Sequence, residues 1–262
     1  SRPRFHLYLI GPVLLGIAAG FESLSSLLRW DLVATLLYFW LPANLLLYGV
    51  NDWFDRDVDR DNDKKKGYEQ AIDQDTDLRL LFYSFLVIGL LSILYAFGLP
   101  LQSKLYLLLF LALSIGYSMP PLRFKTVPLL DSVSNFLYAV PAFLTYNLLP
   151  GMHPSWEWWL LALSWNMGMH TFSAIPDIVS DRLANIETTA TALGDTGAAS
   201  YVAACWIAAA ATGILLGGLW AAPLIIYPVI GAVVATAHEP ISRSWELYKM
   251  LPILNVSIGF YG

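Results

Sequence analysis

The sequence predicts an all-α membrane protein, a polytopic helical bundle of about nine transmembrane helices. Two observations predict this class. The 262 residues are 57% hydrophobic and only 13% charged, whereas soluble domains are roughly half apolar and about a quarter charged. Apolar stretches close to the ~20 residues needed to cross a bilayer core recur along the whole chain. We therefore expect one transmembrane domain over residues 1–262.

The expected spans follow each other with short connections. The first apolar run, after the opening SRPRF, is too long for a cleavable signal alone and is taken as a spanning helix. Prolines interrupt several later runs, which membrane helices tolerate when neighbours satisfy the freed carbonyls. The predicted spans are 5–24, 31–50, 79–98, 104–119, 128–149, 156–176, 198–219, 221–237 and 244–262.

Basic residues gather on one side of this predicted topology. With the N-terminus inside, the loops on that side carry Arg56, Arg60, Lys64, Lys65, Lys66, Arg123, Lys125, Arg182 and Arg243. The opposite side keeps only Arg29 and Lys104 near its loops. Because cytoplasmic loops are enriched in Lys and Arg, we expect a multi-pass protein of the lipid membrane with its charged loops in the cytoplasm.

The first motif that carries chemistry begins where the second span ends. Asn51, Asp55 and Asp59 are spaced four residues apart, so on a helix they share one face. Like charges at that spacing repel, and a hard divalent ion compensates them. Mg²⁺ takes oxygen ligands and is commonly held by carboxylates together with substrate phosphates. The motif therefore predicts a Mg²⁺ site that binds a phosphorylated substrate.

Two other interpretations of this acidic stretch remain. The simplest interpretation is a solvated charged loop. That interpretation does not explain why polar residues come directly after an apolar run. Alternating aspartates also resemble the start of a calcium loop, but counting from Asp57 places Asn62 at the glycine position and Tyr68 at the glutamate position. The calcium interpretation is therefore the weakest.

A second acidic motif ends a later span on the same predicted side. Asp177 and Asp181 follow Pro176 and again stand four residues apart. The pair is a weak signal alone, but with the first motif it supplies carboxylates from two helices. Two metal ions on one diphosphate would neutralise the charge that develops on that leaving group.

A third element, Tyr117 to Lys125, follows the fourth span on the same side. Arg123 offers a guanidinium fork and Lys125 a point charge for phosphate oxygens. Ordinary positive-inside residues in a short loop look the same, so the loop alone leaves both roles open.

Taken together, NDxxDxxxD at 51–59, YSxPPxRxK at 117–125 and DxxxD at 177–181 resemble the UbiA superfamily of intramembrane prenyltransferases. The resemblance implies a nine-helix bundle around a central cavity, two Mg²⁺ ions, an isoprenyl diphosphate donor and a hydrophobic acceptor that enters from the bilayer. It assigns metal and diphosphate binding to Asn51, Asp55, Asp59, Asp177 and Asp181. It assigns Tyr117, Arg123 and Lys125 to a loop that closes over the diphosphate. Because Asp55 and Asp181 each lie in the middle of the proposed metal-diphosphate site, on different helices, we expect both to be catalytic.

Within that family, the opening SRPRF and the wording NDWFDRDVDRDND look most like the lycopene elongases of carotenoid biosynthesis. The expected reaction is then Mg²⁺-dependent transfer of a C5 dimethylallyl group to lycopene. Few polar residues are expected inside the membrane, which suits a hydrocarbon acceptor; they are chiefly Asn44, Asn135, Asn147, Asn166 and His170.

Several alternatives stay open at this stage. Other branches of the UbiA superfamily transfer the prenyl group to a quinone precursor, chlorophyllide or glycerol phosphate, and these acceptors stay as alternatives. A transporter is a distant alternative. Its acidic residues would face a pathway at mid-membrane, whereas the acidic residues here are expected at helix ends on one side. Asp52, Asn166 and His170 are further candidates for substrate binding. His170 lies nearly two turns before Asp177 and is also a candidate base. No nucleic acid partner is expected.

Overall fold

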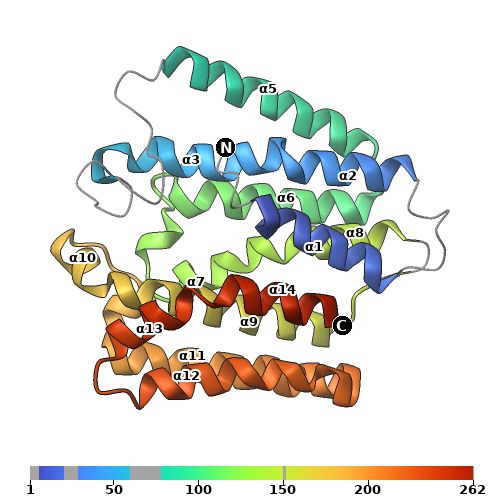
Figure 1. Cartoon of the computed structure of the whole chain (residues 1–262). Coiled ribbons are helices and arrows are strands. Elements are labelled where there is room, and N and C mark those ends of the chain that lie inside the picture. Colours follow the sequence, from blue (N-terminus) through green and yellow to red (C-terminus); the bar gives the residue numbers. More distant parts are fainter. Residues whose placement is uncertain (1–5, 21–28, 60–77, 150–151, 262) are drawn as a thin grey trace. The chain divides into compact units, whose positions relative to one another are not determined.

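The computed structural model describes residues 6–20, 29–59, 78–149 and 152–261 (Figure 1). Every regular element within these ranges is a helix, which confirms the predicted all-α class. The helices form two compact units. The first unit comprises residues 1–123 and 137–153, and the second comprises 124–136 and 154–262. The single domain expected from the sequence stays a prediction.

In its described part, the first unit is built on α3. This helix packs against α2, α5 and α6, while α1 packs against α2 and α8. Gly16 permits the close approach of α1 to α8, because a Cβ at that position would lie 2.5 Å from the carbonyl oxygen of Ala142. The helices of this unit are α1 (His6–Ala19), α2 (Trp30–Trp40), α3 (Pro42–Asp59), α5 (Leu78–Phe97), α6 (Leu101–Ser118) and α8 (Val140–Leu148).

Two of the expected spans are broken by prolines. The span expected at 31–50 divides at Leu41 into α2 and α3, and Pro42 opens the second helix. Proline suits a helix start because its missing N–H would have no partner there. The span expected at 128–149 divides into α7 (Leu130–Ser134), the 3₁₀ turn η4 (Asn135–Tyr138) and α8, with Pro141 in the first turn of α8.

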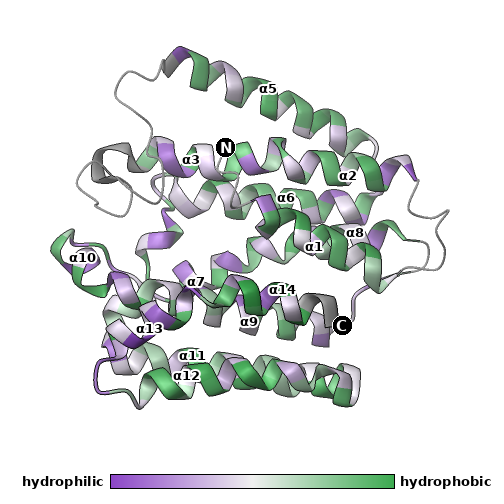
Figure 2. Cartoon of the chain, in the orientation of Figure 1, coloured by the Kyte–Doolittle hydropathy of each residue, from purple (hydrophilic) through white to green (hydrophobic). Residues whose placement is uncertain are grey.

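Four segments of the described chain are long and apolar enough to cross a membrane, and they cover 30–54, 79–97, 101–118 and 189–235. The shorter α1 is also apolar. Figure 2 shows α5 as hydrophobic along most of its length, and most of its large side chains are exposed, as at Leu86 and Leu90. Such a surface suits contact with lipid rather than water. The count of nine spans stays a prediction.

The second unit is organised around α11, which packs against α9 and α12. A capping box begins this helix, because Thr188 and Thr191 exchange hydrogen bonds between side chain and backbone. Gly194, with φ of 72°, kinks it one turn later. The elements of this unit are η3 (Phe124–Thr126), α7, α9 (Trp156–Ala174), η5 (Ile175–Asp177), α10 (Ile178–Leu183), α11 (Thr189–Gly217), η6 (Gly218–Ile225), α12 (Ile226–Ala235), α13 (Pro240–Tyr248) and α14 (Leu251–Tyr261).

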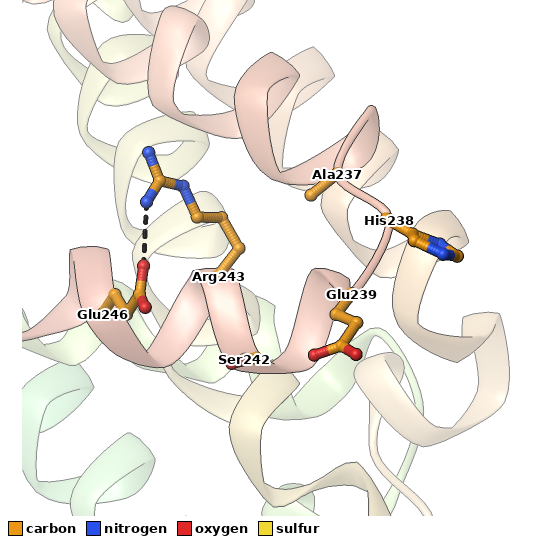
Figure 3. Close-up of a pocket in the computed structure, with 6 residues that line it drawn as sticks. All are labelled: Ala237, His238, Glu239, Ser242, Arg243 and Glu246. Carbon is orange, nitrogen blue, oxygen red and sulfur yellow. Dashed lines mark hydrogen bonds and ion pairs between the residues drawn. The ribbon is translucent and has the colours of Figure 1, made fainter.

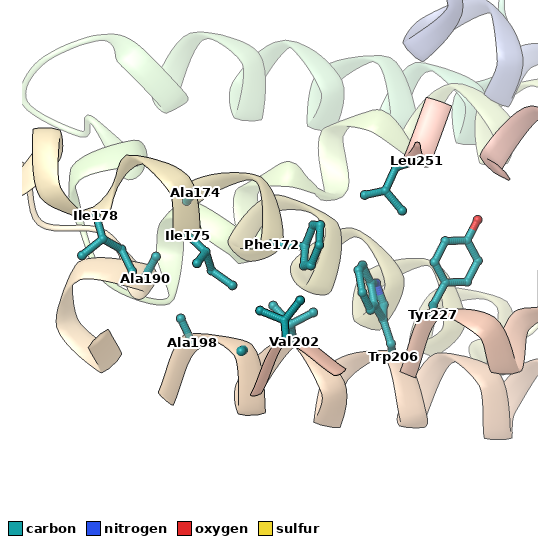
Figure 4. Close-up of a cluster of buried hydrophobic side chains, with 12 residues drawn as sticks. Phe172, Ala174, Ile175, Ile178, Ala190, Ala198, Val202, Trp206, Tyr227 and Leu251 are labelled. Atoms are coloured by element: carbon teal, nitrogen blue, oxygen red, sulfur yellow. The ribbon is translucent and has the colours of Figure 1, made fainter. Parts of the chain in front are cut away.

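The core of the second unit surrounds Trp206 (Figure 4). This indole is fully buried and contacts the rings of Phe172 and Tyr227. Its Nε1 donates to the carbonyl oxygen of Trp165 at 3.3 Å. Gly168 makes room for it, since a Cβ there would lie 2.5 Å from Nε1. The indole therefore holds α11 against α9, the helix that leads into the second acidic motif.

Candidate functional site

The first motif lies on the last part of α3, which continues as a helix to Asp59. The predicted helix through the motif is confirmed, so Asn51, Asp55 and Asp59 belong to one helix at four-residue spacing. Asn51 and Asp52 are half-buried. The side chains of Asp55 and Asp59 lie outside the described part of the structure, so their predicted contacts stay predictions.

A hydrogen bond joins this motif to the third element. The Ser118 hydroxyl, fully buried at the end of α6, donates to Oδ1 of Asn51 at 2.8 Å. Ser118 follows Tyr117, so the end of α6 that begins the predicted diphosphate loop lies against the start of the metal motif. The two sequence stretches are 67 residues apart, and their proximity could not be derived from spacing.

The loop after α6 turns sharply before it reaches its basic residues. The backbone N–H of Arg123 donates to the carbonyl oxygen of Met119 at 3.0 Å, and Arg123 itself has a positive φ of 35°. Lys125 lies in the following 3₁₀ turn, η3. Both side chains are half-buried. Arg123 belongs to the first unit and Lys125 to the second.

The second motif occupies a change of helix type after α9. The α-helix ends at Ala174, η5 carries Pro176 and Asp177, and α10 begins at Ile178. Asp177 is the cap residue of α10 and Asp181 stands one turn into it, both half-buried. The carboxylates thus keep the predicted four-residue spacing. The neighbouring Arg182 donates to the carbonyl oxygen of Thr191 at 3.0 Å.

The structure also identifies an acidic residue that the sequence reasoning missed. Asp131 on α7 is fully buried, and its Oδ2 lies 3.4 Å from Nε2 of His170 on α9. It also accepts hydrogen bonds from the backbone N–H and the hydroxyl of Thr189. Asp131 is the one charged residue in the span expected at 128–149, and this was the signal in the sequence that could have found it.

Asn166 and a pocket outside the motifs contribute less to the candidate site. Asn166 is buried, and its Nδ2 donates to the carbonyl oxygen of Ala162 on its own helix at 2.8 Å, so its substrate-binding role stays a prediction. The pocket is lined by the connection 237–239, which follows α12, and by α13 (Figure 3). An exposed ion pair between Arg243 and Glu246 lies along it, and it contains no motif residue.

Among the described residues, no group of three or more His, Cys, Asp and Glu side chains comes together as a metal site. The side chains of Asp55 and Asp59 lie outside these described residues. The described candidate donors, Asn51, Asp177 and Asp181, offer only oxygen. Oxygen donors of this kind suit a hard cation rather than zinc or copper.

The sequence profile of the UbiA prenyltransferase family matches residues 9–246. The chain belongs to the UbiA prenyltransferase family. This is a family of integral membrane enzymes, and membership confirms that the chain is a prenyltransferase. It also disfavours the transporter alternative.

Known UbiA proteins are similar to this chain over nearly its full length. It is 43% identical to the lycopene elongase/hydratase of Halobacterium salinarum, over 99% of this chain and 92% of that protein. It is also 43% identical to the lycopene elongase/hydratase of Haloferax volcanii, over 99% of this chain and 84% of that protein. These similarities confirm the resemblance to the lycopene elongase branch.

Solved UbiA structures share the fold. A UbiA homolog from Archaeoglobus fulgidus, bound to DMAPP and Mg²⁺, aligns with a TM-score of 0.79 and 21% identity, covering 99% of this chain and 94% of that one. At this identity the alignment shows the UbiA fold and does not assign ligands to this chain.

Proposed function

We propose that this protein transfers a C5 isoprenyl group from dimethylallyl diphosphate to lycopene, in the biosynthesis of C50 carotenoids. The observation that carries the proposal is the 43% identity, over 99% of the chain, to a lycopene elongase/hydratase. Prenylation of a quinone precursor, chlorophyllide or glycerol phosphate is the alternative within the same family.

The polar residues expected inside the membrane support a hydrocarbon acceptor. Asn135 donates to the carbonyl oxygen of Asp131 at 2.7 Å, and Asn166 donates to that of Ala162. Nδ2 of Asn147 donates to the Ser103 hydroxyl at 3.0 Å, and Oδ1 of Asn147 forms a hydrogen bond of 3.0 Å with Nδ1 of His153. These amides are thus engaged by the protein itself. An aromatic or polar acceptor would need partners of its own, whereas a polyene needs only apolar contact.

Asn44 is the exception among these amides. It is fully buried on α3, and neither atom of its amide has a hydrogen-bond partner within the described residues. One such amide does not provide the several directed contacts that a polar acceptor requires. The acceptor preference therefore still points to lycopene.

We assign metal binding to Asn51, Asp55, Asp59, Asp177 and Asp181. The described members fit Mg²⁺, because they offer only oxygen atoms and because Ser118 fixes the amide oxygen of Asn51. When bound, Mg²⁺ offsets the negative charge that grows on the diphosphate leaving group.

The remaining motif residues would handle the diphosphate from the protein side. Arg123 and Lys125 contribute positive charge to its oxygens, the first as a fork and the second as a point charge. Tyr117 and Asp52 are assigned to the same substrate, beside Ser118 and Asn51. Apolar helices would keep bulk water from the allylic cation. On the positive-inside pattern, this end of the bundle faces the cytoplasm.

Pigment analysis in a lycopene-producing host tests the acceptor. Expression of the chain should convert lycopene to C45 and C50 pigments. Unchanged lycopene, in cells that contain the membrane-inserted protein, would contradict the proposal and favour another acceptor. Feeding those cells with the alternative acceptors would then separate the two functions within the family.

A charge-removing variant tests the metal site independently. Asp181→Asn keeps the side-chain shape, and we expect turnover to fall by ~10²–10³, the usual cost of losing one comparable electrostatic contact. Glu187→Gln is the matched control, because it removes one charge from an exposed residue of the same connection and lies outside the motif. Equal turnover of the two variants at limiting Mg²⁺ would remove Asp181 from the site.

A further inference from the structure

A closed set of hydrogen bonds joins α7 to the start of α11 in the second unit. Asp131 is fully buried, and its Oδ2 accepts the backbone N–H of Thr189 at 2.9 Å. Its Oδ1 accepts the Thr189 hydroxyl. The same hydroxyl oxygen accepts the backbone N–H of Leu129 at 2.7 Å. We call Leu129, Asp131 and Thr189 the α7–α11 clasp.

The clasp holds a backbone conformation that leucine rarely adopts. Leu129 is the N-cap residue of α7 and has a φ of 69°. A bulky residue is strained at positive φ, so it keeps that conformation only where surrounding contacts fix it. The hydrogen bond from its N–H to Thr189 is such a contact. The buried carboxylate of Asp131 also needs donors around it. The start of α7 therefore depends on Thr189 at two places.

On one side, the clasp leads to Lys125. The backbone N–H of Asp131 donates to the carbonyl oxygen of Val127 at 3.0 Å, and the N–H of Val127 donates to that of Phe124 at 3.1 Å. These two bonds extend from α7 to η3, the 3₁₀ turn that carries Lys125. The backbone at Lys125 is thus joined to Asp131 by a short series of hydrogen bonds.

On the other side, the clasp leads to the second acidic motif. Thr189 is the first residue of α11. Arg182 of α10 donates to the carbonyl oxygen of Thr191, in the same first turn of α11, at 3.0 Å. The backbone N–H of Ile186 donates to the carbonyl oxygen of Asp181 at 2.8 Å. The helix that carries Asp181 is therefore bonded to the turn of α11 that the clasp holds.

We propose that Asp131 is a positioning residue for the donor diphosphate, because the clasp fixes the turn of Lys125 relative to the helix of Asp181. This inference rests on the proposed function, which assigns Lys125 and Asp181 to the same diphosphate. Groups that act on one ligand must be placed accurately relative to each other, and small displacements weaken their action. Asp131 is 0% exposed, so it acts through Lys125 and does not itself contact the donor.

Two variants of Thr189 test the clasp with little change in packing. Thr189→Val keeps the side-chain shape and the backbone N–H but removes the hydroxyl that bonds Asp131 and Leu129. Diphosphate release by the purified protein measures the KM for dimethylallyl diphosphate. We expect Thr189→Val to raise this donor KM ~3–10-fold, the equivalent of one net hydrogen bond, with the KM for the acceptor unchanged.

Thr189→Ser is the conservative variant of this pair. It retains the hydroxyl, so the donor KM should stay within about twofold of the wild type. Equal increases in Thr189→Val and Thr189→Ser would show that the hydroxyl has no positioning role and would overturn the proposal.

A double-mutant cycle with Lys125 separates positioning from an independent effect. Asp131→Asn replaces one acceptor oxygen with a donor, and it should raise the donor KM ~10-fold, as should Lys125→Ala. If Asp131 acts through Lys125, adding Asp131→Asn to Lys125→Ala should raise the donor KM by no more than about twofold further. Additive effects would overturn the proposal, and so would a donor KM that Lys125→Ala leaves unchanged.

Gly168→Ala is the control for lost stability. The atoms nearest to its added Cβ belong to Trp206, in the core of the same unit, and not to the clasp. We expect a lower unfolding temperature with a donor KM within about twofold of the wild type. If Gly168→Ala raised the donor KM as much as Thr189→Val at a similar loss of stability, the effect would be one of stability alone and the proposal would fail.

The wild-type chain distinguishes this inference from the proposed function. If it releases diphosphate with another acceptor but not with lycopene, the assignment of lycopene fails. The same variants, assayed with that acceptor, then decide the role of Asp131, because their readout is the donor KM.

Discussion

Removal of the Ser118 hydroxyl tests the contact that joins two motifs. Ser118 is fully buried, and its hydrogen bond of 2.8 Å orients the Asn51 amide. Ser118→Ala deletes this bond without adding volume. A net hydrogen bond contributes about 1 kcal/mol to stability, and the half-buried Asn51 amide does not carry the full cost of an unpaired buried acceptor. We therefore expect Ser118→Ala to lower the free energy of unfolding by about 1 kcal/mol.

The effect on catalysis follows from the role proposed for Asn51. If the amide loses a comparable amount of its orientation in the transition state, turnover falls about 10-fold, because ~1.4 kcal/mol corresponds to a factor of ten in rate. The lost activity should appear as slower diphosphate release at saturating donor, and raising the Mg²⁺ concentration should partly restore it.

Ser114→Ala is a matched control on the same helix. Ser114 lies one turn before Ser118 and is also buried, but its hydroxyl has no hydrogen-bond partner within the described residues. Deleting an unpartnered hydroxyl should leave stability unchanged or slightly raised. Thermal unfolding in detergent and diphosphate release measure both variants. Equal losses in the two would refute the claim that the Ser118 bond orients the metal motif.

Two further predictions concern donor binding and packing. The double variant Arg123→Ala with Lys125→Ala should raise the KM for the donor by ~10²-fold or more, at ~1.5–3 kcal/mol for each of the two charged hydrogen bonds. The KM for the acceptor should change little. Unchanged kinetics at every donor concentration would leave both residues as positive-inside charges. Gly168→Ala would place a Cβ 2.5 Å from Trp206 and should destabilise the protein by ~1–3 kcal/mol. Gly89→Ala, where nothing lies within 4 Å, should not; equal unfolding temperatures would refute the close contact.

Local periodicity was enough to predict the helices that carry the motifs. Four-residue spacing predicted the helix through Asn51 and Asp59, and α3 extends to Asp59. Apolar length likewise predicted α5 and α6 to within a few residues. Such helices depend on residues that are close together in the sequence, so one sequence is enough to predict them.

The changes in helix type were harder to derive. The span at 156–176 was expected to be a regular α-helix, but Pro176 lies in the 3₁₀ turn η5. A 3₁₀ turn has three residues per turn rather than 3.6, so it rotates Asp177 relative to His170. From α-helical spacing these two residues were expected to face nearly the same way. The 3₁₀ turn therefore changes the angle between them about the helix axis.

Contacts between distant residues could not be predicted at all. Ser118 forms a hydrogen bond with Asn51, which is 67 residues away in the sequence. Asp131 forms one with Thr189, which is 58 residues away. The sequence marked His170 as a candidate base but gave no means of choosing its carboxylate. That choice depends on how α7, α9 and α11 pack, which is a property of the folded unit.

The burial of Asp131 constrains the order in which the protein can be assembled. During synthesis this carboxylate is made before its partners, and Thr189 follows only 58 residues later. Until then an aspartate near the bilayer has to be protonated, hydrated or shielded, because a charge among apolar groups without hydrogen-bond donors is unfavourable. Stable insertion of α7 therefore requires α9 and the start of α11. Chains released from the ribosome before Thr189 should remain extractable from the membrane or be degraded, and Asp131→Asn should relieve this dependence.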